Sequence, residues 1–214
     1  MIALFLSAFV TLFVVIDPPG CAPIFASLTN GASNAQRRAM AIRSTMIAAF
    51  LLLMFALVGE KLLAVLGISL DAFRIAGGIM LSLIALEMVF EKRTERREVR
   101  AEEISRKAAE EQRPVEDISV FPMAIPMIAG PGSIATVMLL VSRSQGPQQT
   151  ATVLAALAVV LVMTLAALLA AGPIMRVLGP KLEAMITRLL GVLLAALAAQ
   201  FVINGIVAAF GIEV

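Results

Sequence analysis

Two short motifs place helix-breaking residues inside long apolar stretches, and the first motif also holds a carboxylate. Asp17 precedes Pro18, Pro19, Gly20 and Cys21 in the run VVIDPPGCAPIF. Because a residue before proline leaves the α region and a proline ring clashes with the preceding turn, the incoming helix is predicted to end near residue 15 or 16. Aspartate at an N-cap and proline at the first helical position favour a second helix. Its first N–H groups, at Gly20, Cys21 and Ala22, are expected to be free.

The second motif, PMIAGPGSI, repeats this arrangement without an acid. Gly130 is a candidate cap, Pro131 a candidate first helical residue, and Gly132, Ser133 and Ile134 candidate donors of free N–H groups. In lipid an unsatisfied backbone group costs several kcal/mol, so each break is expected to be buried in protein or to line a wet cavity. Two helix N-termini near the middle of a membrane would bind a substrate carboxylate, and the freed carbonyls would bind a cation or a substrate ammonium.

Three polar side chains within the apolar segments are further candidates for this site. Asp17 has Ala129 at the equivalent place of the second motif. An acid within a span is a candidate cation ligand or proton carrier, and the structural alternative is a simple N-cap worth about 1 kcal/mol. Gln200 and Asn204 lie one helical turn apart on the last apolar segment, where they either bond to a neighbouring helix or line the cavity.

The composition restricts the chain to membrane proteins. Hydrophobic residues make up 60% and charged residues 15% of the 214 residues, which leaves too little polar surface to cover a soluble core. Six apolar segments reach the length of a span, about 20 residues. They cover residues 1–28, 39–58, 70–90, 119–141, 149–169 and 188–210. The sequence therefore predicts an all-α polytopic membrane protein, with its first segment kept as an uncleaved span.

The residue types that are missing argue against an enzyme. The chain has no histidine, and Cys21 is its one cysteine. Histidine-based metal sites, Ser-His and Cys-His nucleophile pairs and a disulfide framework within the chain are therefore excluded. Paired acids and a nucleotide-binding P-loop are also absent from the sequence. We expect neither an enzymatic activity nor a cofactor.

The two halves of the chain resemble each other. VLGISLDA at residues 65–72 aligns with VLGPKLEA at residues 177–184, and the same offset places Pro19 and Gly20 on Pro131 and Gly132. RIAGGIML and RLLGVLLA align slightly beyond. Two copies of a three-helix unit enter the membrane from opposite faces, because each copy has an odd number of spans. The repeats and their broken helices therefore predict an inverted-repeat architecture, which is common among secondary transporters.

Positive charge is distributed unevenly between the predicted loops. Of the 17 Lys and Arg residues, all but Lys61, Arg74 and Arg143 would lie on one side of the membrane. Positively charged loops face the cytoplasm. The charged linker, residues 91–117, is therefore expected in the cytoplasm and both termini outside. This linker divides the chain into a first three-helix membrane repeat (1–90), the linker itself (91–117) and a second three-helix membrane repeat (118–214).

Four sequence blocks carry a resemblance to a known family. DPPGCAPIF, RIAGG from Arg74, FPMAIPMIAGPGSI from Phe121 and RLLGVLLAALAAQFVINGI from Arg188 resemble recurrent blocks of the MarC family of bacterial and archaeal inner-membrane proteins. The resemblance implies a six-span protein of a prokaryotic plasma (inner) membrane. Some relatives are described as transporters of alanine, glycine and serine. Many relatives carry Asn where this chain has Cys21, so the substrate range is expected to differ here if that Asn binds substrate.

The breaks favour a secondary transporter for a small neutral amino acid or similar zwitterion. It would work by alternating access, driven by an ion or solute gradient, with Na⁺ or H⁺ as the candidate coupling ion. Two alternatives stay open: a channel filtered by the breaks, and a non-transporting scaffold or regulator that docks partners through the linker. Deleting the linker separates the scaffold from the transporter, which should keep its flux.

The expected partners are a small-molecule substrate and the lipid bilayer, and no nucleic acid. Small residues permit close contacts between membrane helices. Gly77, Gly78 and Gly191 could serve such contacts either within the bundle or between subunits. A homo-oligomer is therefore left open.

Overall fold

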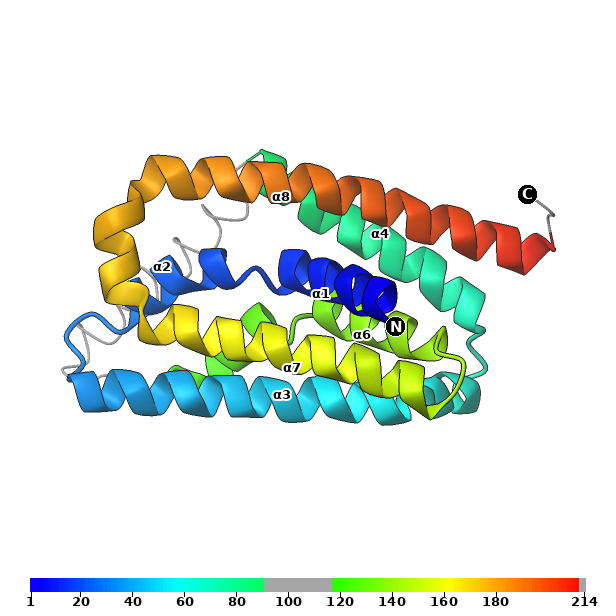
Figure 1. The fold of residues 1–214 in the computed structure, drawn as a ribbon, viewed down its shortest axis with the longest axis horizontal. Helices are drawn as coiled ribbons and strands as arrows, with labels where there is room; N and C mark the ends of the chain where they lie inside the picture. The colour runs from blue at the N-terminus through cyan, green and yellow to red at the C-terminus, as the bar shows by residue number, and fades with distance from the viewer. Residues whose placement is uncertain (91–116, 212–214) are drawn as a thin grey trace.

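The chain folds into a bundle of long helices, as Figure 1 shows. The computed structural model describes residues 1–90 and 117–211, and the side chains of this part except those of residues 173–184 and 186–187. Its helices are α1 (Ile2–Ile16), α2 (Pro18–Leu28), α3 (Asn34–Val65), α4 (Leu70–Val89), η1 (Ser119–Ile128), α6 (Pro131–Ser142), α7 (Pro147–Leu169) and α8 (Ala171–Phe210). Within the described residues there is no strand, so the all-α prediction is confirmed.

Five helical stretches are long and apolar enough to cross a membrane. They are Ile2–Leu28, which joins α1 and α2, Asn34–Val65, Leu70–Val89, Pro147–Leu169 and Arg188–Phe210. The pair Ser119–Ile128 and Pro131–Ser142 is bent by 53° and makes a sixth span when it is taken as one. The prediction of about six spans is confirmed, and both predicted breaks lie inside spans. The linker prediction, apart from Asp117, lies outside the described residues, so the three-part division stays a prediction.

Serine caps start the two long helices of the first half. Ser33 accepts a hydrogen bond from the Gln36 N–H at 3.3 Å, while the Gln36 side chain accepts one from the Ser33 N–H at 2.9 Å. This reciprocal capping box explains why α3 begins at Asn34, five residues before the predicted apolar segment. Ser69 caps α4 by accepting from the Ala72 N–H at 3.1 Å. Both loops therefore end at well-defined helix starts.

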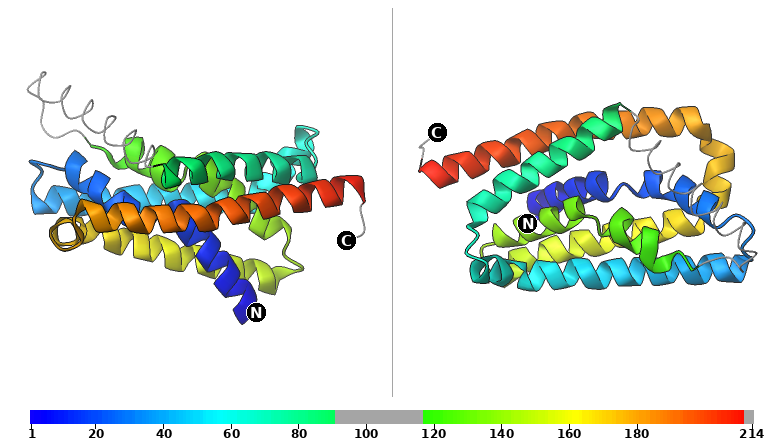
Figure 2. Two further views of the ribbon diagram at one scale, coloured as in Figure 1. Left: turned by 90° about the horizontal axis from the view of Figure 1, so that it is seen from above. Right: turned by 180° about the vertical axis from the view of Figure 1, so that it is seen from behind.

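The helices of the two halves pack against one another in a reciprocal way. α1 and α2 pack on α7, as η1 and α6 pack on α3, while α4 packs along α8 and α3 contacts α7. Figures 1 and 2 show α4 and α8 side by side from three directions. A two-fold relation that exchanges the halves would produce this pairing. The inverted repeat itself stays a prediction.

Close helix contacts explain the glycines of the α4–α8 pair. A Cβ on Gly78 would lie 2.9 Å from the Ala198 carbonyl oxygen, and one on Gly205 would lie 3.1 Å from the Asp71 carbonyl oxygen. A Cβ on Gly191 would lie 3.1 Å from the Val89 backbone nitrogen. These distances to backbone atoms leave no room for a side chain. The small residues of this pair therefore serve packing within one chain.

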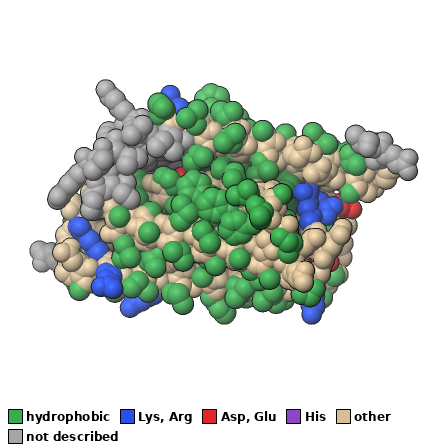
Figure 3. All heavy atoms as spheres, viewed as in Figure 1, with side chains coloured by type: hydrophobic (Ala, Val, Ile, Leu, Met, Phe, Trp, Pro, Cys, Tyr) green, Lys and Arg blue, Asp and Glu red, His purple; other side chains and the backbone are tan. Residues whose placement is uncertain are grey.

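The outside of the bundle is apolar and its two helix breaks are buried. Large apolar side chains such as Phe50 and Val162 are exposed, and Figure 3 shows apolar side chains across the middle of one face with Lys and Arg toward its two ends. Around the breaks, one buried cluster includes Ile16 and Cys21 from the first motif and Ile128 and Ala129 from the second. The sequence thus brings both motifs into the same core.

Candidate functional site

The first helix break is centred on a buried aspartate. Asp17 has φ 57° and ψ 64°, a left-handed conformation that ends α1, and only 1% of its surface is exposed. Aspartate and asparagine tolerate this conformation better than most residues. Its Oδ1 accepts a hydrogen bond from the Gly20 N–H at 3.1 Å. The predicted N-cap is therefore present, and the same residue places a carboxylate in the core.

The expected free N–H groups of the first break are not found. The Gly20 N–H donates to the Asp17 carboxylate, and the Cys21 N–H donates to the Asp17 carbonyl at 3.0 Å as the first helical bond of α2. The Cys21 thiol, fully buried, donates to the Ile16 carbonyl at 3.5 Å. The prediction of free donors at Gly20 and Cys21 is wrong, because Asp17 and the first turn of α2 use them.

The first break instead presents groups with negative charge or partial negative charge. The carbonyl of Val14 would accept a helical bond from residue 18, but Pro18 carries no N–H. This carbonyl therefore loses its helical donor in the same core that holds the Asp17 carboxylate. A cation or an ammonium group is the chemical partner of such a site.

The second break has the opposite polarity. Gly130 is the N-cap of α6 and has no side chain to cap it, and Pro131 has no N–H. The first helical bond runs from the Ile134 N–H to the Gly130 carbonyl at 3.0 Å. The N–H groups of Gly132 and Ser133 have no hydrogen-bond partner in the described part of the chain, and both residues are buried. Two of the expected free donors are therefore found at this break, where they suit an anion. The prediction for Ile134 is wrong, because its N–H makes the first bond of α6.

The segment before the second break, η1, is a π-helix, which has a wider turn than an α-helix. η1 holds Pro122 and Pro126, and its backbone departs from helical angles at Phe121 and Ile125. Because Pro122 has no N–H, the Ile118 carbonyl accepts instead from the Met123 N–H, five residues on, at 3.2 Å. A Cβ on Gly130 would lie 2.4 Å from the Pro126 carbonyl oxygen. Glycine is therefore required for the chain to pass from η1 into α6.

The two breaks lie against each other. A Cβ placed on Gly132 would lie 3.6 Å from Cγ1 of Val15, the residue two before Asp17. It would also lie 2.6 Å from Cδ1 of Ile84 on α4. The end of α1 thus packs close to the uncapped start of α6 through the side chain of Val15. Two helix ends of opposite polarity therefore lie in one part of the core.

The structure places Gln200 and Asn204 away from the breaks. The Gln200 side chain donates to Asn204 Oδ1 at 2.9 Å, on an exposed part of α8. Between them in sequence, Phe201 lies under the Arg143 guanidinium at 5.2 Å. Arg143 follows α6, so about 18 Å of helix separates this level from the second break. Of the two predicted roles, lining the cavity of the breaks is therefore wrong; the pair instead satisfies itself along one helix face.

Sequence reasoning missed Thr136, one turn beyond Gly132 on the same face of α6. It is fully buried, and its Oγ1 has no hydrogen-bond partner among the described residues. Threonine in a helix commonly bonds to the carbonyl four residues back, so an unpaired hydroxyl here is unusual. The available signal was a threonine four residues after a glycine in an otherwise apolar helix.

Comparison with known proteins places the whole chain in one family. Residues 2–210 match the model of MarC family integral membrane proteins. The chain belongs to the MarC family. A UPF0056 membrane protein of Methanocaldococcus jannaschii is 36% identical over 94% of this chain and 95% of its own. UPF0056 membrane protein YvbG of Bacillus subtilis is 34% identical over 96% and 95%. UPF0056 inner membrane protein YhgN of Escherichia coli is 35% identical over 94% and 95%.

Membership in the MarC family shows that this is an integral membrane protein. It does not show the protein's activity, which has to be inferred from the candidate site. The matched region includes both helix breaks, so they belong to the part shared with these relatives. The relatives' names give a membrane location and no reaction or substrate. No solved structure matches the chain. The geometry of the breaks is therefore the main evidence on function.

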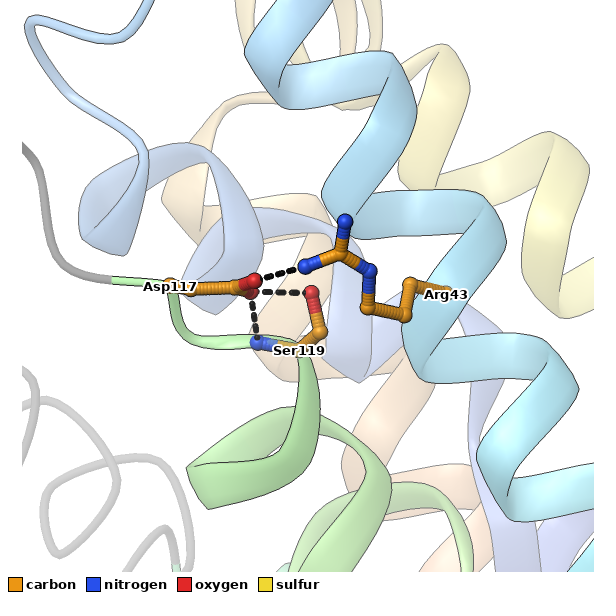
Figure 4. Close-up of polar contacts among 3 residues, drawn as sticks. All are labelled: Arg43, Asp117 and Ser119. Carbon is orange, nitrogen blue, oxygen red and sulfur yellow. Dashed lines mark hydrogen bonds and ion pairs between the residues drawn. The ribbon is translucent and has the colours of Figure 1, made fainter.

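A polar contact at the bundle's end positions η1 in this MarC family protein. As Figure 4 shows, the Asp117 carboxylate accepts hydrogen bonds from the Arg43 guanidinium of α3 and from the Ser119 hydroxyl and N–H, the last at 3.0 Å. These contacts, chiefly the Ser119 hydroxyl bond, hold the pKa of Asp117 below its usual value of 3.8. The carboxylate therefore links the start of η1 to α3 while it is ionised.

We expect this contact to stabilise the protein at neutral pH and to fail in acid. Because the folded pKa is lowered, the contribution is complete above the usual pKa and is lost as the pH falls through the lowered value. The carboxylate is about half exposed, so the effect is small, below about 1 kcal/mol. Thermal unfolding of wild type and Asp117→Asn should differ slightly at pH 6 and coincide near pH 2. A difference that persists unchanged in acid would contradict this role.

Proposed function

We propose that this protein is a secondary transporter for a small neutral amino acid or a similar zwitterion. The observation that carries the proposal is the opposite polarity of two adjacent buried helix breaks. The first presents the Asp17 carboxylate and the Val14 carbonyl, whose helical donor position is taken by Pro18, and the second presents the uncapped N–H groups of Gly132 and Ser133. An α-amino acid carries an ammonium and a carboxylate on one carbon, so one molecule can meet both ends.

The proposed substrate pose assigns one charge to each break. The ammonium lies at Asp17 and the carbonyl end of α1. The carboxylate accepts from the Gly132 and Ser133 N–H groups, and the Ser133 hydroxyl, on a residue with 3% exposure, is a third possible donor. We assign the site a short substrate side chain, because the side chains of Val15 and Ile84 crowd the Gly132 backbone. Alanine, glycine and serine are the natural candidates.

The proposed mechanism is alternating access around these breaks. Both halves contribute one broken helix to the site, so a movement of one half against the other would open the site to one side at a time. The sequence carries no nucleotide-binding P-loop, and we assign the driving force to an ion or solute gradient. Asp17 is the residue proposed to couple transport to Na⁺ or H⁺, because it is the one acid at the breaks.

The proposed setting is the plasma (inner) membrane of a prokaryote, with the linker in the cytoplasm and both termini outside. One relative, YhgN, is named an inner membrane protein, and the distribution of Lys and Arg supports the orientation. Cysteine-accessibility labelling in whole cells tests it. Labelling of a linker cysteine from outside intact cells would overturn the orientation.

Uptake into proteoliposomes tests the proposed function. We expect saturable uptake of labelled alanine, glycine or serine when a Na⁺ or H⁺ gradient is imposed. We expect little competition by leucine or phenylalanine, whose larger side chains would clash with the Val15 and Ile84 side chains that crowd Gly132. Empty vesicles give the background, and the uptake signal collapses when an ionophore removes the coupling gradient. Protein that is folded by thermal unfolding but moves none of the three amino acids under either gradient would overturn the proposal.

A further inference from the structure

A cavity lies at the end of the bundle where α2 and α7 end and α3 and α8 begin. Figure 1 shows these four helix ends gathered together. They enclose a cavity of about 290 Å³. Its lining includes Phe25, Asn34, Arg37, Arg38, Leu168 and Gly172. This cavity has no part in the mechanism proposed above.

The polar side of the cavity is positively charged. Arg37 and Arg38 are the two charged residues among the described residues that line it, and none of these residues is an acid. The Arg37 Nε–H donates to the Thr29 carbonyl at 3.1 Å, which fixes the guanidinium beside the end of α2. Its terminal nitrogens, and all of the Arg38 guanidinium, have no hydrogen bond or ion pair in the described residues. Two guanidinium groups with free donors match a phosphate.

The start of α3 adds to the positive electrostatic potential of the cavity. Asn34 lines the cavity and is the first residue of α3, whose N-terminus carries partial positive charge. The nearest acid that the structure describes on this end, Asp117, is held by Arg43 and Ser119 and is not part of the lining. The charge in the cavity is therefore not neutralised by the described part of the chain.

The opposite wall is apolar and lies where lipid headgroups meet acyl chains. Phe25, Leu168 and Leu169 supply apolar side chains, and Leu169 is 48% exposed. Because the apolar spans α2, α3 and α7 all begin or end here, this level corresponds to the membrane surface. Basic pockets between membrane helices are suited to anionic headgroups. A free phosphate would use the arginines and leave the apolar wall unused.

We propose that this cavity binds the phosphate of an anionic phospholipid, with its glycerol and upper acyl chain against the apolar wall. Arg37 and Arg38 hold the phosphate, and the apolar wall selects a lipid over a small phosphate compound. Because the cavity joins α2 to α3, α7 and α8, a bound lipid fixes the end of the helix that begins at the first break. The protein is then more stable in anionic than in zwitterionic membranes.

Native mass spectrometry of the detergent-purified protein with phosphatidylglycerol or phosphatidylcholine tests the proposal. We expect phosphatidylglycerol to bind more tightly, and the double variant Arg37→Gln/Arg38→Gln to lose at least about tenfold in affinity, as expected for charge-assisted hydrogen bonds. Arg43→Gln is the control, and each single variant, Arg37→Gln or Arg38→Gln, is compared with it, because Arg43→Gln removes one positive charge from the same helix outside the cavity. Arg43→Gln should bind within about twofold of wild type. Equal losses in Arg43→Gln and in the single variants would overturn the site.

A second variant keeps both arginines and closes the space. A Cβ on Gly172 would meet no atom within 4 Å, so Gly172→Leu should fold and should reduce lipid binding by filling the cavity. Inorganic phosphate and glycerol 3-phosphate are added as competitors to separate the two sources of phosphate. Their failure to displace the lipid at millimolar concentration supports the lipid site. Full displacement by inorganic phosphate would overturn the lipid assignment, and unchanged binding in Gly172→Leu would overturn the cavity as the location.

Discussion

Replacing Asp17 by asparagine should stop substrate uptake and leave the fold intact. Asparagine tolerates the left-handed backbone conformation of residue 17, and its side-chain oxygen can accept the bond that the Gly20 N–H donates. The carboxylate charge is the one feature removed. We expect uptake to fall by about 30-fold or more, the equivalent of a charge-assisted hydrogen bond to the substrate ammonium or the coupling ion.

Asp17→Ala is the matched variant for this experiment. Alanine loses the cap, which costs about 0.5–2 kcal/mol, and adopts the left-handed conformation poorly, at roughly 1–2 kcal/mol more. Thermal unfolding in detergent should therefore rank wild type and Asp17→Asn together and Asp17→Ala below them, while both variants lose uptake. Asp17→Asn that transports at the wild-type rate would reduce Asp17 to a structural cap and remove it from the site.

The sequence predicted the positions of both breaks and missed their opposite polarity. Proline and glycine act locally, so DPPG and GPG identify helix ends without knowledge of the fold. The difference follows from the two N-cap residues, Asp17 of α2 and Gly130 of α6. Aspartate folds back onto the Gly20 N–H, whereas glycine has no side-chain acceptor and leaves the donors of the second break unused. This consequence could have been drawn from the sequence.

Other parts of the site depend on packing that spacing alone does not determine. Gln200 and Asn204 share a helix face, as predicted, but the orientation of α8 places that face at the bundle surface. Helix α8 also begins at Ala171, well before the predicted apolar segment, which begins at residue 188. Hydropathy identifies the apolar span and says little about the helix that leads into it. Whether the Thr136 hydroxyl finds a hydrogen-bond partner depends on which side chains pack around it, and the sequence alone does not determine that packing.

Gly130→Ala should be among the most destabilising single-methyl changes in the described part of the chain. The backbone at Gly130, with φ −75° and ψ 169°, is allowed for alanine, so the cost arises from contact and not from conformation. The new Cβ would lie 2.4 Å from the Pro126 carbonyl oxygen. Because that oxygen belongs to the backbone of η1, neither group can rotate away, and the chain on one side of the break must move.

We expect Gly130→Ala to lose about 3 kcal/mol, the upper range for overpacking in a core, which lowers the unfolding temperature by roughly 6–12 °C at this chain length. Gly172→Ala makes the same chemical change where a Cβ meets no atom within 4 Å. This variant should therefore have the same unfolding temperature as the wild type. Any Gly130→Ala protein that remains folded should also transport poorly, because moving the cap displaces the Gly132 and Ser133 N–H groups from the first break. Normal stability together with normal uptake would show that η1 and α6 can shift freely, and the donors of the second break would then not be fixed in place as the proposed site requires.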